Sequence, residues 1–387
     1  MNTYPHRTMV YGLRLKMLGF FLTISRLKMV FAHVKNPLKG IKLLRGMLAL
    51  RSELIGSRSA QKMSKVGAKY RWALYVPAWP SNTWNQFFRG ELNRRHPIAG
   101  KSNRFINVFV AITKKCSLQC EHCFEWEALN GKEKLSLADL KVIVKRISDM
   151  GVSQIQLSGG EPMLRFQDLL EVIGTGPKEV EFWLLTSGLN LTADNASRLK
   201  AAGLTGVVVS LDHFEPELHN QFRGYQKAFY WAGEAIKNAN NNGMVTAISI
   251  CVTRPFVTES NLMAYAELAK EWGVSFIQVL EPKAVGHYDG KDVALLPEQE
   301  KLLEAFYLKL NYEEGFRQYP LVSYHGFYQR RIGCLSSGSR SFYVDTNGDM
   351  HACPFCRKVH GNMLEDHWEE NLESMGAKGC MSFKGLE

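Results

Sequence analysis

Alternating apolar and polar positions predict six strands in the central part of the chain. Each is a short run rich in Val, Ile, Leu and Phe, bounded by glycine or polar residues, as is typical of buried strands. The runs are residues 105–113, 154–158, 181–187, 206–212, 245–253 and 275–281.

Helical patterns occupy the stretches between these runs. The first is the clearest: Ser136 is a candidate N-cap with Asp139 three positions on, apolar residues recur at helical spacing, and Gly151 ends the pattern. Strands that alternate with helices form parallel sheets through right-handed crossovers. We therefore predict an α/β fold whose parallel sheet curls into a partial barrel, with ligands at the carboxyl ends of its strands. Further helices are predicted over 193–202, 227–240 and 260–272.

The residues outside this region divide the chain further. With 387 residues and 45% hydrophobic content, the chain can bury a large core and holds more than one domain. We expect a core over 105–290, with a basic amphipathic helical arm and an aromatic connector before it and a helical bridge and a small cysteine-rich domain after it. The bounds expected for these four flanking segments are 1–71, 72–104, 291–333 and 334–387.

Positive charge is concentrated in the arm. Residues 1–71 hold fifteen Lys or Arg and one acid, Glu53, which gives +14, whereas the whole chain carries +11; the remainder is therefore −3. The longest uncharged run in the apolar part is the nine residues 17–25, which is too short to span a bilayer. The sequence after it is basic, unlike a secretory cleavage site. The arm is expected either to pack on the body as a solvated helix, or to lie on an anionic membrane surface or a partner; nucleic-acid binding is disfavoured because no recognised motif is present.

Three of the eight cysteines, Cys116, Cys120 and Cys123, lie within eight positions. Disulfide scaffolds are shorter chains with denser cysteine, so we expect reduced thiols and a cytoplasmic protein. A structural zinc ion needs four ligands, and no second cysteine pair lies nearby, although His122 could serve. A cluster of four irons held by three thiolates is the remaining chemistry, and it leaves one iron open to a ligand.

A second motif, SGGEP at Ser158–Pro162, ends the second predicted strand. Its glycines allow a ligand to approach the backbone closely, and Glu161 can accept a hydrogen bond from a ligand ammonium. A CxxxCxxC loop followed by a strand ending in GGEP resembles the radical S-adenosylmethionine (radical SAM) enzymes. The resemblance implies a (β/α)6 partial barrel, a [4Fe-4S] cluster on the three cysteines, and SAM bound to its open iron. It also implies reductive cleavage of SAM to a 5′-deoxyadenosyl radical, which takes a hydrogen atom from the substrate.

The resemblance also assigns residues to SAM. In relatives of the SPASM/Twitch type, a serine and an arginine at the positions of Ser210 and Arg223 contact the SAM carboxylate, and a forked guanidinium suits that group. A solvated arginine after a strand is the alternative for Arg223. Ser187 stands where many relatives carry asparagine. The residues expected around SAM are His122, Ser158, Gly159, Gly160, Glu161, Ser187, Ser210, Asp212 and Arg223.

The carboxyl-terminal segment holds Cys334, Cys353, Cys356 and Cys380, and a hairpin is predicted around Asn347. Their spacing resembles the opening signature of SPASM/Twitch domains. The full SPASM pattern has more cysteines, so the resemblance implies the shorter Twitch form with one auxiliary [4Fe-4S] cluster. A four-cysteine zinc ribbon is the structural alternative.

Enzymes of this architecture commonly modify peptides, so we expect a peptide or protein substrate and a reductant such as flavodoxin or ferredoxin. A small molecule or a membrane lipid is the alternative substrate. A non-catalytic iron-sulfur scaffold or electron carrier is the alternative of another class, and the intact SGGEP, Ser210 and Arg223 argue against it, because a carrier needs no SAM site. Glu281, His287 and Asp289 follow the last predicted strand and are expected to be solvated loop residues, so no substrate-side catalytic residue is named. The expected location is the cytoplasm, with peripheral attachment to the inner face of the membrane if the arm binds lipid.

Overall fold

The structure, a computed structural model, describes residues 7–56, 58–97, 105–334 and 336–375. Its centre is a sheet with the strand order β10-β9-β8-β7-β6-β5-β4-β11-β12. Strands β4 to β9 are the six predicted from the sequence, and each is parallel to the next. Their bounds are Asn107–Ala111, Gln154–Ser158, Glu181–Thr186, Leu204–Ser210, Val245–Cys251 and Phe276–Leu280. The predicted partial barrel is confirmed.

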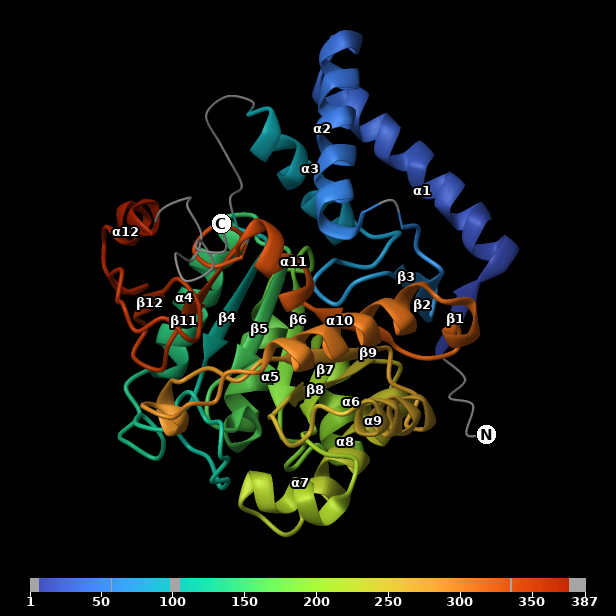
Figure 1. Cartoon of the computed structure of the whole chain (residues 1–387). Helices are drawn as coiled ribbons and strands as arrows, with labels where there is room; N and C mark the ends of the chain where they lie inside the picture. Colours follow the sequence, from blue (N-terminus) through green and yellow to red (C-terminus); the bar gives the residue numbers. More distant parts are fainter. Residues whose placement is uncertain (1–6, 57, 98–104, 335, 376–387) are drawn as a thin grey trace.

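Helices cover the outer face of this sheet (Figure 1). The first, α4, has the predicted capping box between Ser136 and Asp139 and ends before Gly151, whose φ of 78° few other residues adopt. Its buried Ile143 and Ile147 belong to the main core, which also contains alternate residues of the strands. Helices α4 to α9 span Leu137–Asp149, Phe166–Thr175, Ala193–Ala202, Pro216–Arg223, Ala228–Asn241 and Glu259–Glu271.

The segment after the core was expected to be a helical bridge, and the structure differs. After α10 (Pro297–Tyr312) the chain forms strand β10 (Leu321–Tyr324), which pairs parallel to β9, and then α11 (Gly326–Ile332). The run Leu321–Tyr324 is only four residues long, and such short apolar runs do not identify a strand without a neighbour to pair with.

The carboxyl-terminal hairpin is confirmed as β11 (Ser341–Val344) and β12 (Met350–His351), which pair antiparallel. Strand β11 also pairs parallel to β4, so this segment extends the barrel sheet. A last helix, α12, spans Trp368–Ser374. Cys380 lies outside the described residues.

The arm was expected to be helical, and the structure adds a small sheet to its helices. It contains two long helices, α1 (Gly12–His33) and α2 (Pro37–Ile55), but also a small antiparallel sheet of β1 (Arg7–Tyr11), β2 (Lys62–Val66) and β3 (Lys69–Arg71). The short strands of this sheet come together only through long-range pairing of β1 with β2, which local periodicity does not reveal. The connector adds α3 (Asn82–Arg95) after Pro77 and Pro80.

The base of the arm packs against the amino ends of the barrel strands. Arg71 donates a hydrogen bond of 2.5 Å to Glu181, the first residue of β6, and both side chains are buried. Ser64 bonds Ser275, just before β9, at 2.8 Å. Leu74 lies in a cluster with Phe276 and residues at the starts of other strands. The helices α1 and α2 therefore stand away from the barrel at the end opposite α7, as Figure 1 shows.

Candidate functional site

The cysteine loop follows the carboxyl end of β4 and is held by backbone hydrogen bonds from two sides. Gly160 and Glu161 donate to the carbonyls of Thr113 and Lys115 at 2.8 and 2.7 Å. On the other side, Gln119 donates to the carbonyl of Arg223 at 3.1 Å, at the end of α7. The loop that carries the three cysteines is thus fixed between the SGGEP motif and α7.

This packing explains why two glycines are needed in the SGGEP motif. A Cβ atom on Gly159, which has a φ of 135°, would lie 2.5 Å from the carbonyl oxygen of Thr113. One on Gly160 would lie 2.3 Å from the carbonyl oxygen of Lys115. The sequence suggested that a ligand approaches the backbone here, whereas in the structure the backbone of the cysteine loop already requires glycine at both positions.

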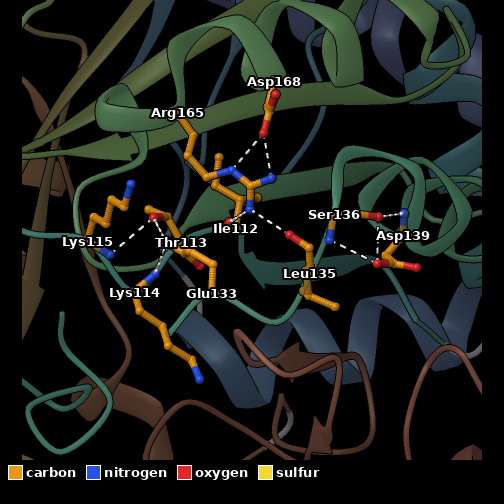
Figure 2. Close-up of polar contacts among 10 residues, drawn as sticks. All are labelled: Ile112, Thr113, Lys114, Lys115, Glu133, Leu135, Ser136, Asp139, Arg165 and Asp168. Atoms are coloured by element: carbon orange, nitrogen blue, oxygen red, sulfur yellow. Dashed lines mark hydrogen bonds and ion pairs between the residues drawn. The ribbon is translucent and has the colours of Figure 1, made fainter. Parts of the chain in front are cut away.

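Polar contacts brace the entrance to the same loop, and Figure 2 shows them. Glu133 accepts hydrogen bonds from the Thr113 hydroxyl and from the Lys114 backbone, the latter at 3.0 Å. Arg165, three residues after the SGGEP motif, donates to the carbonyl of Ile112 at 2.6 Å and pairs with Asp168. No local pattern pointed to Glu133, which lies in a loop without a motif. Arg165 could have been suspected only from its place near SGGEP.

The three thiols are neighbours, and Cys120 contributes to raising the pKa of Cys116 and of Cys123. Burial is the larger cause, raising the pKa of Cys116 to about 11 and that of Cys123 to about 12. Cys120 is buried, and burial raises the pKa of its thiol also. Thiols bind metal as thiolates, so a cationic group must offset the cost of deprotonation in this site.

Arg223 supplies one positive charge beside the thiols. Its Nη1 lies 3.5 Å from Sγ of Cys120, while Nε and Nη2 both donate to Asp212 at 2.6 Å. Asp212 also accepts from the backbone of Cys251 at 3.0 Å. The alternative of a solvated arginine is excluded, because Arg223 is only 7% exposed.

Burial is the largest single influence and by itself would raise the pKa of Asp212, but Arg223, the two nearby histidines and the Cys251 backbone together hold this pKa below its ordinary value. The pairing with Asp212 raises the pKa of Arg223. Nδ1 of His219 accepts from the backbone of Asp212 at 3.0 Å, and burial lowers the pKa of His219 to about 4. The imidazole is therefore neutral, and Arg223 and Asp212 form a fixed charged pair.

The carboxylate of Glu161 is fully engaged by the chain. It accepts from the Thr186 hydroxyl at 2.7 Å, from the backbone and hydroxyl of Ser187 at 2.8 and 2.5 Å, and from the backbone of Met163 at 3.1 Å. Burial is the largest influence and raises the pKa of Glu161 despite these donors. Glu161 and Ser187 thus join the ends of β5 and β6. Their predicted contacts with SAM stay predictions.

The other residues predicted around SAM lie on the same edge. Ser158 and Ser210 are the last residues of β5 and β7, and Ser210 is half-buried. His122 stacks on Phe222 with ring centroids 5.0 Å apart, and burial lowers its pKa to about 4. Its Nδ1 is buried and has no hydrogen-bond partner among the described residues. The structure brings these residues to one edge of the sheet, and their roles stay predictions.

The loop after β9 also contributes, contrary to expectation. His287 lies over the cysteine loop: its backbone donates to the carbonyl of Cys123 and its Nδ1 contacts that of Cys120, both at 2.9 Å. Its ring stacks on Trp126 at 3.9 Å. Glu281 accepts hydrogen bonds from Tyr324 at 2.6 Å and from Arg330 at 2.7 Å. Neither His287 nor Glu281 is a solvated loop residue, because the chain folds other segments against them.

The carboxyl-terminal cysteines lie beside the first cysteine loop. Burial and the neighbouring thiols of Cys356 and Cys334 raise the pKa of Cys353. The backbone of Ser337 donates to Sγ of Cys334 at 3.4 Å. The side-chain contacts that join this segment to the first cysteine loop include Tyr343 to Glu125 at 2.5 Å and Lys114 to Asn347 at 2.8 Å.

These residues fit the predicted cluster. Three neighbouring thiols, two of them half-buried, surround a site with an adjacent guanidinium and buried polar groups. In the part of the chain that the structure describes, no group of three or more His, Cys, Asp or Glu side chains is arranged to hold a single metal ion. The fold and the site define an α/β protein with neighbouring cysteine thiols at the carboxyl edge of a partial barrel.

Comparisons with known proteins agree with this class. The model of the radical SAM superfamily matches residues 110–269. Mycofactocin maturase MftC of Mycolicibacterium smegmatis is 28% identical over 277 residues, which cover 67% of this chain and 68% of the relative. PqqA peptide cyclase of Xanthomonas axonopodis pv. citri is 25% identical, with 71% and 74% covered. AdoMet-dependent heme synthase of Methanosarcina barkeri is 27% identical, with 68% and 80% covered.

Among solved structures, Streptococcus suis SuiB bound to its precursor peptide SuiA superposes with a TM-score of 0.56. It is 15% identical, and the match covers 75% of this chain and 69% of SuiB, so this likeness concerns the fold. The chain therefore contains a radical SAM domain over residues 110–269 and is an enzyme that resembles maturases of the SPASM/Twitch type. Its cofactors are accordingly SAM and a [4Fe-4S] cluster.

Proposed function

We propose that this radical SAM enzyme modifies a peptide or protein. The observation that carries the proposal is the convergence of the cysteine loop, SGGEP, Ser210 and Arg223 at the carboxyl edge of the barrel. The base of the arm packs against the amino ends of the strands, so the substrate approaches from the carboxyl edge. The names of two relatives support a peptide: one is a peptide cyclase, and SuiB was solved with its precursor peptide.

The bound cluster and SAM together supply a carbon radical that removes a hydrogen atom from the substrate. The chain's own residues bind SAM and orient it. A guanidinium has five N–H donors, and three of those of Arg223 face Asp212 and Cys120. Two N–H groups therefore remain for the SAM carboxylate, beside the half-buried Ser210. Asp212 holds the guanidinium in place, and Glu161 holds the ends of β5 and β6 together.

The auxiliary cluster on Cys334, Cys353, Cys356 and Cys380 is part of this proposal. The proximity of Cys334, Cys353 and Cys356 supports this cluster. Cys380 lies outside the described residues. We also infer that a flavodoxin or ferredoxin reduces the cluster and that the basic arm brings the enzyme to an anionic membrane surface. Neither partner is needed for SAM cleavage when a chemical reductant is present.

A small molecule is the second candidate substrate, because a heme synthase is about as similar in sequence as the maturases. The test is a direct assay of hydrogen transfer. Anaerobically reconstituted enzyme with dithionite and SAM should form 5′-deoxyadenosine. A small precursor peptide encoded beside this gene, perdeuterated, should transfer deuterium into the 5′-deoxyadenosine and change in mass.

The control is the variant Cys116→Ala/Cys120→Ala/Cys123→Ala with the same peptide, which should show neither change. Deuterium transfer from a perdeuterated porphyrin and none from the peptide would favour the small-molecule candidate. Formation of no 5′-deoxyadenosine by a protein loaded with its cluster would contradict the enzyme function itself.

A further inference from the structure

The outward side of the arm is a large feature that the proposed chemistry does not use. Nineteen large hydrophobic side chains are exposed in the described ranges, and nine of them lie between Tyr11 and Leu48. Exposed apolar side chains scattered singly are normal, but a concentration of this kind marks an interaction surface.

Helix α1 is apolar on two faces. On one face Leu22 and Val30 are buried and pack in a cluster with Trp84 and Phe88. On the opposite face, apolar residues recur at alternating spacings of four and three positions, so they lie above one another along the helix. We call this row of residues the outer stripe. Leu13 is 75% exposed and Phe20 62% exposed. The outer stripe consists of Leu13, Met17, Phe20, Ile24, Leu27 and Phe31.

Basic residues accompany the outer stripe. Lys16 and Lys28 lie on its two sides and are exposed. Helix α2 has the same combination: Leu38 is 77% and Leu48 61% exposed, and the exposed basic residues Lys39, Lys42 and Arg45 lie between them. The sequence contains no Asp or Glu before Glu53.

We infer that α1 and α2 bind an anionic lipid surface in the plane of the membrane. The outer stripe enters the boundary between headgroups and acyl chains, and the lysines reach the lipid phosphates. No helix in the described part of the chain is long and apolar enough to cross a membrane, so the helices lie on the surface.

The positive charge of α1 disfavours a second copy of this chain as the partner that covers the outer stripe. A stripe with steps of four and three residues could form a coiled coil, but such pairs need opposite charges beside the seam. Two copies of α1 would bring only lysine and arginine together. The extent of the surface favours lipid: Leu13 and Phe31 are about 27 Å apart along the helix axis, and the exposed apolar residues continue on α2.

The inference gives the proposed enzyme an orientation. The base of the arm packs at the amino ends of the strands, whereas the cysteine loop follows the carboxyl end of β4. A membrane beneath the arm therefore lies at the end of the barrel away from SAM. The substrate arrives from the aqueous side, which argues against a lipid embedded in that membrane as the substrate.

The test is cosedimentation of the full-length, cluster-loaded enzyme with vesicles of equal parts phosphatidylcholine and phosphatidylglycerol, and with pure phosphatidylcholine. The wild type should bind the anionic vesicles at least about tenfold more tightly. Leu13→Gln/Met17→Gln/Phe20→Gln should weaken this binding at least about tenfold, because three side chains lose their contact with acyl chains. Lys39→Gln/Lys42→Gln should weaken it about fivefold per lysine at low salt, and high salt should weaken wild-type binding.

Matched controls are Tyr230→Gln, an equally exposed apolar residue on α8, and Lys178→Gln, an exposed lysine far from the arm in sequence; both should bind as the wild type does. Equal wild-type binding to neutral vesicles, or none to either, would overturn the inference. So would a dimer in sedimentation equilibrium that the triple variant loses, because the stripe would then be a contact between copies. Cleavage of SAM by all variants, measured in parallel, separates these outcomes from a failure of the proposed enzyme function.

Discussion

The carboxyl edge of the barrel and the outward face of the arm differ in how their side chains are satisfied. At the carboxyl edge, charged and polar groups are buried and paired within the chain: Arg223 with Asp212, and Glu161 with Thr186 and Ser187. On the outward face of the arm, four of the six side chains of the outer stripe are exposed, as are the lysines beside them. A preorganised cofactor site needs groups that are already held, because reorganisation at the moment of reaction is costly. A surface that meets a fluid partner needs exposed side chains, since its contacts form only on binding.

The largest expected effect is at the carboxyl edge. The variant Cys116→Ala/Cys120→Ala/Cys123→Ala should lose all detectable SAM cleavage, because the three thiolates act as one unit. After anaerobic reconstitution it should still hold about four irons on the carboxyl-terminal cysteines, and further replacement of Cys353 and Cys356 should remove them. About one zinc and no iron in the triple variant would show a zinc ribbon instead of an auxiliary cluster.

The next largest effect is expected where the base of the arm meets the barrel. Arg71→Met leaves Glu181 buried without its cation and should lower the free energy of unfolding by about 3 to 5 kcal/mol, measured by urea denaturation. Arg71→Met/Glu181→Leu should recover part of this loss, since no charge is then left buried. Arg89→Met on the exposed side of α3 is the control and should change little. An equally small change for Arg71→Met would mean that the arm is not anchored by this pair.

A smaller effect is expected from His219, which lies behind Arg223 and Asp212 and is neutral: the free energy of unfolding should depend on pH. Burial lowers its pKa from 6.5 to about 4, so the unfolded state binds the proton more tightly. Its contribution to stability is complete above pH 6.5 and falls as the pH drops toward 4, by about 2 kcal/mol at pH 5. The free energy of unfolding at pH 7 and pH 5 measures this loss. His219→Gln should reduce the difference, and an unchanged difference would show that His219 does not titrate in this way.

The smallest effect is at the outward face of the arm. Leu13→Gln exchanges a side chain that is 75% exposed, so the free energy of unfolding should change by less than about 0.5 kcal/mol. SAM cleavage should also stay at the wild-type rate. A clear loss of stability would mean that the outer stripe packs against the protein itself, and the contrast between the two ends would disappear.

The strands of the core and the cofactor class could be predicted from the sequence. The run QIQLS alternates polar and apolar residues, and this alternation predicted β5 at its full length, Gln154–Ser158. The cysteine spacing and SGGEP are local motifs whose chemistry depends on residue type. Together they were sufficient for the fold, the superfamily and its cofactors.

Only the tertiary structure decided how these parts are held. Glu133, Arg165 and His287 brace the cysteine loop from distant positions, and no local pattern marks such contacts. The glycines of SGGEP, expected to admit a ligand, admit the backbone of that loop. The sequence determined that the arm is basic and apolar, because composition is local. Long-range packing decides which of the two apolar faces of α1 is buried, and it places the arm at the amino ends of the strands. Hydrophobic periodicity alone does not specify such packing.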